Sequence, residues 1–358
     1  VLDPDAVALE AELMRLAELS EHGEPAATAL REAAEAASSD ARAAALFRAE
    51  AAVHKDHLHA PAAAVEALGR AAARRPDHLP IQRAILEASA HAGTWDIAAK
   101  AAMDICRTRE LLDEDVLASL AQAADVTDGW DPLLAALDEA LSDVTGLPTA
   151  VARDLYAQVA RWHLQNRDDL SAAETSARNA LGFAAGHRPT LEFLADLQRR
   201  LPEASQGDEP PLCLTLVEVD ALSDRSLDVL AEAAEVSTRA PASAPFRRRL
   251  LARLYRKSAR LLAAAESAVG ERDPQTLVTW ALEELVKLDV EADRSADAIK
   301  ALIAAAQMPL PRESVEGLRV RAARLCTDIG DRRGAIDLYR RVLDERADDI
   351  QLVRELAA

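Results

Sequence analysis

Phe, Trp and Tyr together make up only 3% of this chain of 358 residues. Half of the residues are nevertheless hydrophobic, and alanine is the most common of them. Alanine has the highest helix propensity, and its small side chain lets two helices approach closely. A core with so little bulk can be dense only if it is spread over many short helix contacts. The composition therefore predicts an all-α protein built as an array of helices.

The sequence also lacks the short motifs of several enzyme classes. It contains no GxGxxG, no GxxxxGK followed by Ser or Thr, no HExxH and no GxSxG. No phosphate-binding loop, zinc-binding helix or nucleophile elbow is therefore indicated. We predict that the chain is not an enzyme, and that it has neither catalytic residues nor a cofactor.

Basic residues are fewer than acidic residues, and long apolar runs are absent from the sequence. The formal net charge is -19, which disfavours nucleic acid and anionic lipid as partners because both bind cationic surfaces. No uninterrupted apolar run of about 18 residues occurs, so we predict no membrane insertion. The three cysteines lie far apart and form no disulfide or metal pattern, which favours a cytoplasmic location. They are Cys106, Cys213 and Cys326.

The densest group of possible metal ligands contains His54, His57, His59 and Asp56. The spacing of His54 and His57 can place both imidazoles on one face of a helix. Zinc needs at least one further ligand, and polar side chains are expected where a helix ends. We therefore predict no metal site.

Small and apolar residues recur with a period of 34 residues. A period of this length is typical of stacked helical repeats. The stretch 45–78 contains Ala51, Ala52, Ala64, Leu68, Ala71 and Pro76, and one period later Ile85, Leu86, Ala98, Ala102 and Ile105 follow in the same register. The stretch 316–349 repeats the pattern with Ala322, Ala323, Gly330, Ala335, Tyr339 and Val342.

These residues resemble the tetratricopeptide-repeat family, in the form of a bacterial-type helical repeat array. The resemblance implies an α-solenoid of antiparallel helical hairpins wound into a right-handed superhelix. Further hairpins are expected at 9–44, 115–148 and 154–187. We place a regular array at 5–201, a Pro-rich linker at 202–211, and irregular helical repeats at 212–358.

In the second half, the sequence periodicity predicts helices at about 223–236, 245–269, 274–289 and 293–307. The alternating stretch 212–219 is compatible with a strand, but we favour a helix. The chain begins at Val1 without an initiator Met and stops at Ala358 inside a repeat. We therefore expect it to be a piece of a larger protein.

The family resemblance implies a concave groove lined by the first helix of each repeat, in which a protein or peptide partner binds. Trp162 is equally compatible with a core position. The groove lacks the repeated Lys, Asn and Arg set that clamps a C-terminal carboxylate, so a chaperone-tail receptor is not indicated. Counting along the repeats gives Leu46, Ala49, Val53, Asp56, Pro80, Arg83, Glu87, Ala90, Leu155, Gln158, Trp162 and Gln165 as lining residues, with His91 beside them.

A basic helix is expected at 247–260 in this otherwise acidic chain. Arg249, Arg253, Arg256 and Arg260 are spaced to form one ridge opposite an apolar stripe. The ridge is interpreted either as a solvated face or as a docking site for an acidic partner.

Taken together, these patterns predict a protein interaction scaffold. Two alternatives stay open, namely a regulatory or substrate-recruiting segment of a larger enzyme and a subunit that stacks into a homo-oligomer.

Overall fold

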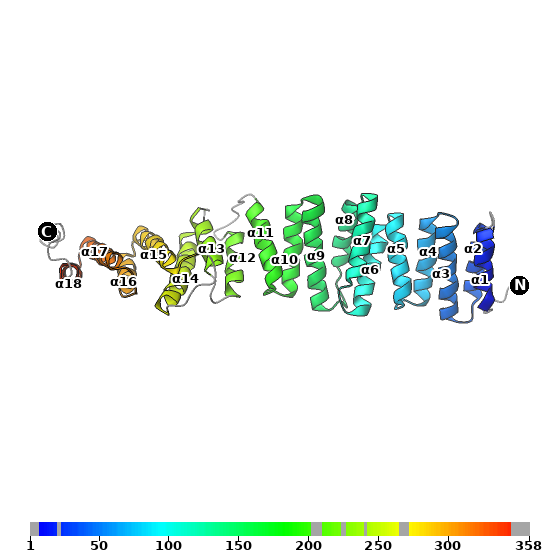
Figure 1. Ribbon diagram of the computed structural model, residues 1–358, viewed down its shortest axis with the longest axis horizontal. Helices are drawn as coiled ribbons and strands as arrows, with labels where there is room; N and C mark the ends of the chain where they lie inside the picture. The colour runs from blue at the N-terminus through cyan, green and yellow to red at the C-terminus, as the bar shows by residue number, and fades with distance from the viewer. Residues whose placement is uncertain are drawn as a thin grey trace. The chain divides into compact units, whose positions relative to one another are not determined.

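A computed structural model describes residues 7–19, 23–201, 210–222, 227–239, 242–264 and 272–344. Within these residues the chain forms eighteen helices and no strand. Figure 1 labels the helices along the chain from α1 to α18. The all-α fold of helical hairpins is therefore confirmed. The right-handed superhelix stays a prediction.

The chain divides into two compact units, Val1–Thr190 and Leu191–Ala358. Ten helices lie in the described part of the first unit, and α11 begins at the boundary. In the first unit the helices are α1 (Val7–Leu19), α2 (Gly23–Ala36), α3 (Asp40–Asp56), α4 (Pro61–Arg74), α5 (Leu79–Ala92), α6 (Trp95–Arg109), α7 (Glu114–Thr127), α8 (Trp130–Leu141), α9 (Thr149–Arg167) and α10 (Leu170–Phe183).

The second unit contains most of α11 (Arg188–Arg200) and all later helices. The boundary between the two units falls inside α11, which precedes the linker expected at 202–211. Residues 202–209 lie outside the described part of the chain, so the linker stays a prediction. The later helices are α12 (Pro211–Ala221), α13 (Asp228–Arg239), α14 (Ala244–Ala263), α15 (Pro274–Glu291), α16 (Ser295–Ala305), α17 (Arg312–Asp328) and α18 (Arg332–Leu343).

Successive helices of the first unit pack as hairpins, with α3 against α4, α5 against α6 and α9 against α10. Helix α2 also packs against α3, and α4 against α5, so each hairpin stacks on the next. Gly93 ends α5 in the left-handed region at a φ of 71°, which glycine adopts without strain. Asp128 and Asp168 make the corresponding turns after α7 and α9 at φ values of 53° and 49°.

Two local expectations about helix positions can be compared with the structure. The hairpin expected at 9–44 ends earlier, because the Ser39 hydroxyl accepts a hydrogen bond from the Arg42 amide and caps the start of α3. The stretch 212–219 is a helix rather than a strand. Its buried Cys213, Leu216 and Asp220 follow the helical spacing of three and four residues.

The interior of the first unit is built largely from small residues. The periodic Ala64 and Ala71 of α4 and Ala98 of α6 are at most 1% exposed. Gly129, at the start of α8, has no room for a side chain because the buried Trp95 ring packs directly over it. This close packing explains how an array with few aromatic residues forms a continuous core.

Candidate interaction surfaces

The predicted groove residues of α5 are accessible on one side of the helix. Arg83, Glu87 and His91 follow one another at intervals of four residues, and all three are exposed. The Glu87 carboxylate accepts a hydrogen bond from Lys55 of α3, with a Nζ–Oε1 distance of 2.7 Å, and about half of each side chain is exposed. The His91 ring Nδ1 lies 2.8 Å from the Glu87 carbonyl oxygen. The Lys55–Glu87 pair therefore links α3 and α5 at the surface.

Arg83 also has a structural partner, Asp113, which is the N-cap residue of α7. Arg83 Nη2 donates to Asp113 Oδ2 at 3.0 Å, and Arg109 Nη1 donates to the same oxygen at 2.5 Å. The other carboxylate oxygen caps α7 by accepting hydrogen bonds from the backbone amides of Asp115 and Val116. Because the Asp113 side chain is only 2% exposed, Arg83 helps to compensate a buried charge. Its substitution therefore tests stability as well as binding.

Two opposing effects act on the pKa of the Asp113 carboxyl. Burial by itself raises the pKa of this carboxyl. The hydrogen bonds from Arg109, Arg83 and the Val116 amide act in the opposite direction and outweigh burial, so the pKa lies below its usual value. The carboxylate is therefore more stable in the folded than in the unfolded chain.

This depressed pKa predicts a pH dependence of stability. The contribution of Asp113 is present above the unfolded-state pKa of about 3.9 and is lost as the pH falls through the lower folded-state pKa. We expect the free energy of unfolding of the parent to fall more steeply below about pH 4 than that of Asp113→Asn. Urea denaturation of both proteins at several pH values measures this difference. Parallel pH profiles for the two proteins contradict the assignment.

A groove lies beside the Lys55–Glu87 pair, with a volume of about 380 Å³. Its walls come from α1, α3, α4 and α5, and half of the lining residues are alanine. Charged side chains stand among the small ones. The lining residues are Glu10, Met14, Ala45, Arg48, Ala49, Ala51, Ala52, Lys55, Asp56, Ala64, Leu68, Ala84, Glu87 and Ala88.

The structure corrects several of the predicted groove positions. Leu46 and Val53 of α3 are fully buried, and Ala90 of α5 is 2% exposed. The predicted Ala49, Asp56 and Glu87 do line the groove. They are joined there by residues that each lie one position before an expected one, namely Ala45, Arg48, Ala52 and Lys55. The reason is that a one-residue difference turns a helical side chain by about 100°, which is enough to move it from the surface into the interior.

On α9 the structure separates the three predicted residues. Gln165 is exposed, and the half-buried Gln158 accepts a hydrogen bond from Arg161 at 3.2 Å. Trp162 is 6% exposed, and its ring meets Trp130 of α8 edge to face, with centroids 5.6 Å apart. The core alternative therefore holds for Trp162, and the groove position predicted for it is wrong.

The basic ridge of α14 has exposed and structural members. Arg249, Arg256 and Arg260 are exposed. Arg253, by contrast, donates to the buried Asp220 of α12 at 2.7 Å. Lys257, on the same helix, donates to the other oxygen of that carboxylate at 2.5 Å. At least Arg253 therefore stabilises the fold, and a docking role for the remaining three stays a prediction.

In the structure His54, of the histidine cluster, lies inside the fold and pairs with an acid of its own helix. His54 is buried, with Nε2 3.7 Å from Oε1 of the buried Glu50, which also accepts a hydrogen bond from Arg70 of α4. Within the described ranges, no group of three or more His, Cys, Asp or Glu side chains is arranged to hold a metal ion. None of the described helices is both long enough and apolar enough to cross a membrane.

Sequence analysis missed the buried carboxylates that join neighbouring helices. These are Glu50, Asp113, Asp220 and Asp289. Asp289 of α15 accepts hydrogen bonds from Arg248 of α14 and pairs with Arg294. A signal was available for Asp220, because it continues the buried stripe of α12 in helical register. An acidic residue at an apolar position indicates a basic partner elsewhere in the fold.

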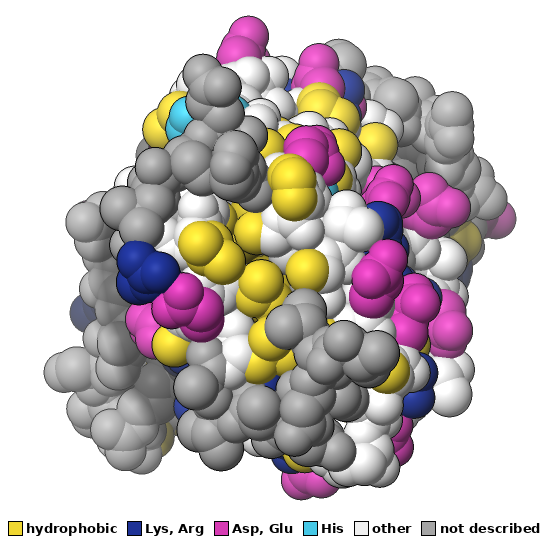
Figure 2. Space-filling view, turned by 90° about the vertical axis from the view of Figure 1, so that its right-hand side faces the viewer, with side chains coloured by type: hydrophobic (Ala, Val, Ile, Leu, Met, Phe, Trp, Pro, Cys, Tyr) yellow, Lys and Arg dark blue, Asp and Glu magenta, His cyan; other side chains and the backbone are white. Residues whose placement is uncertain are grey.

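Figure 2 looks onto the end of the first unit where α1 and α2 lie. Hydrophobic side chains are visible near the middle of this face, and acidic side chains surround them. Leu16 of α1 is 39% exposed.

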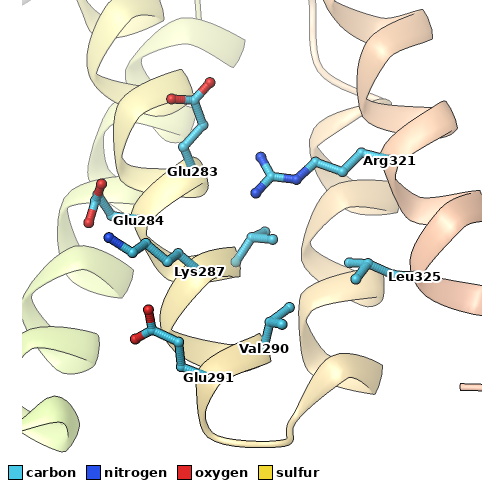
Figure 3. Close-up of a pocket in the computed structure, with 8 residues that line it drawn as sticks. Glu283, Glu284, Lys287, Val290, Glu291, Arg321 and Leu325 are labelled. Carbon is cyan, nitrogen blue, oxygen red and sulfur yellow. The ribbon is translucent and has the colours of Figure 1, made fainter. Parts of the chain in front are cut away.

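A second groove lies in the second unit between α15 and α17, with a volume of about 540 Å³. Figure 3 shows Arg321 and Leu325 of α17 pointing across the gap toward α15, where Glu283 and Val290 face them. The other lining residues all come from α15. They are Glu284, Val286, Lys287 and Glu291.

No protein-family model and no curated protein matches the chain. Similar solved structures include the TPR domain of P58(IPK), with 14% identity, a TM-score of 0.25, and coverage of 97% of this chain and 95% of that one. Yeast Tom70 has 10% identity, a TM-score of 0.27, and coverage of 98% and 94%. Naa15/Naa10 bound to HypK-THB has 13% identity, a TM-score of 0.30, and coverage of 98% and 60%.

One of these similar structures is thus a TPR domain. The low identities and TM-scores give no basis for transferring a partner from these proteins.

Proposed function

We propose that this chain is a protein interaction scaffold, and that the groove beside α3 and α5 binds a helical segment of a partner protein. The observation that carries the proposal is the combination of a groove of about 380 Å³ with a lining of alanine side chains. Alanine at a helix surface lets a second helix approach the backbone closely, which increases the number of van der Waals contacts.

The charged side chains at this groove favour specificity. Lys55 and Glu87 are already paired with each other, so less side-chain entropy is lost when a partner binds against them. Glu10 is likewise held by Arg42 of α3, with an Nη1–Oε2 distance of 3.2 Å. A partly ordered polar rim around a small-residue surface resembles the general anatomy of protein interfaces.

The charge of the first unit indicates what kind of partner is favoured. Acidic residues clearly outnumber basic residues among the first 190 residues. The resulting negative potential accelerates association with cationic proteins and slows association with acidic ones. The proposed partner therefore presents a basic surface around the helix that enters the groove.

The test fills the groove without altering its charge. Ala52 lines the groove and is only partly buried. We expect Ala52→Trp to weaken partner capture by at least about tenfold, equivalent to about 1.4 kcal/mol, because the indole ring occupies the space of the partner helix. Affinity capture from a native lysate with quantitative mass spectrometry measures the loss.

The matched control is Ala62→Trp, since Ala62 is exposed on α4 and does not line the groove. Both variants should melt within a few degrees of the parent, and Ala62→Trp should retain the captured proteins. If the parent and Ala52→Trp capture the same proteins in equal amounts, the proposal for this groove is wrong.

A further inference from the structure

The groove between α15 and α17 contains charged side chains that have no partner in the described part of the chain. Glu283, Glu284, Lys287, Glu291 and Arg321 line it, and none of them makes an ion pair or a side-chain hydrogen bond there. On α15 the residues Glu283, Lys287 and Glu291 are spaced for helical ion pairs, yet the pairs do not form. These groups are therefore available to a ligand without loss of an internal contact.

The two walls of this groove differ in charge. Three glutamates and one lysine stand on α15, so that wall is net negative. Arg321 stands alone on the α17 wall, and Figure 3 shows its guanidinium extending toward the gap. An occupant gains most from basic side chains directed at α15, which carries the larger net charge.

Apolar side chains lie between the charged ones. Val290 is 41% exposed, and Leu325 is half-buried on the facing helix. Val286 is 1% exposed and closes the base of the groove between them. An apolar side chain inserted here removes Val290 and Leu325 from water, a gain that scales with the apolar area that is buried.

We propose that the α15–α17 groove binds a basic peptide segment of a partner protein, with one aliphatic side chain between Val290 and Leu325 and Lys or Arg side chains against Glu283 and Glu291. The site lies in the second unit and does not depend on the groove beside α3 and α5. A second copy of this chain is disfavoured as the occupant, because two chains of net charge -19 repel each other.

The experiment selects ligands without knowing the partner. A displayed library of random peptides is first depleted on the Glu283→Gln/Glu291→Gln variant of the full chain, which removes peptides that bind other acidic surfaces. The remaining peptides are then selected on the parent chain. Enriched peptides should combine Lys or Arg with a nearby Leu, Ile or Val.

Affinities of the enriched peptides are then measured by fluorescence anisotropy. Glu283→Gln/Glu291→Gln and, separately, Val290→Thr should each weaken binding about tenfold, and the loss on the charge variant should shrink in high salt. The charge-matched control is Glu313→Gln/Asp337→Asn, and the apolar control is Ile336→Thr, because all three residues are exposed outside the groove. Both controls should bind like the parent.

Three outcomes overturn the proposal. Depletion leaves no enriched peptide, the enriched peptides are acidic, or the controls weaken binding as much as the groove variants. Sedimentation of the full chain tests the second-copy alternative, and dimerisation that is lost in Glu283→Gln/Glu291→Gln also overturns the proposal. Circular dichroism confirms that each variant keeps the helix content of the parent.

Discussion

Replacing Trp162 with Ala is expected to lower the free energy of unfolding by about 3–5 kcal/mol. The side chain is 6% exposed and belongs to the core of the first unit, together with Leu155 and Val159 of its own helix. Its ring meets the ring of Trp130 of α8. Truncation removes this apolar contact area and leaves a cavity that neighbouring small residues cannot fill. The edge-to-face contact with Trp130 adds about 0.5–1.5 kcal/mol beyond the buried area.

Urea denaturation followed by circular dichroism measures the Trp162 effect. Gln165→Ala is the control on the same helix, because Gln165 is exposed one turn further along. Its effect should stay within about 0.5 kcal/mol. If Trp162→Ala unfolds at the same urea concentration as the parent, Trp162 is not part of the core.

Replacing Asp220 with Ala is expected to lower the free energy of unfolding by about 3–5 kcal/mol. The Asp220 side chain is 1% exposed and accepts hydrogen bonds from Arg253 and Lys257 of α14. Arg253 is partly exposed and can turn toward water, but the Lys257 side chain is only 12% exposed. Loss of the carboxylate removes the buried acceptor that Arg253 and Lys257 share, and with it two charge-assisted hydrogen bonds.

The control for Asp220 is Glu218→Ala, since Glu218 is exposed two residues earlier on α12. Its effect should stay within about 0.5 kcal/mol. A double-mutant cycle with Asp220→Leu and Lys257→Met separates the pair from the packing around it. The double variant should be more stable than Asp220→Leu alone, because the Lys257 ammonium then no longer faces an apolar side chain in place of the carboxylate. If Asp220→Ala and Glu218→Ala destabilise the chain equally, the buried pair contributes nothing.

Much of the local structure follows from the sequence. Repeated small residues in a 34-residue period indicate hairpins, and Gly93 indicates a turn that ends a helix. Ala64, Ala71 and Ala98 were predicted as repeat positions, and all three are buried. These predictions succeed because helix propensity and turn chemistry depend on neighbouring residues, which the sequence displays directly.

Candidate binding residues were harder to predict, as Arg83 and Arg253 illustrate. Both belong to charged patterns that indicate a partner surface. In the structure each donates to a buried carboxylate, Arg83 to Asp113 and Arg253 to Asp220. These acids lie 30 and 33 residues away along the chain. Helical spacing groups the arginines, but it does not tell which of them faces an acid on another helix.

The pattern of residues along the chain is enough to predict a series of short helices with small, closely packing faces. Only the tertiary structure shows that Trp162 is a core residue and that Leu46 and Val53 are buried. It also shows that Glu283, Lys287 and Arg321 make no ion pair within the described ranges. The physical reason is that side-chain periodicity is a local property of one helix. Burial and charge pairing depend on which other helices cover that face, and those helices come from distant parts of the chain.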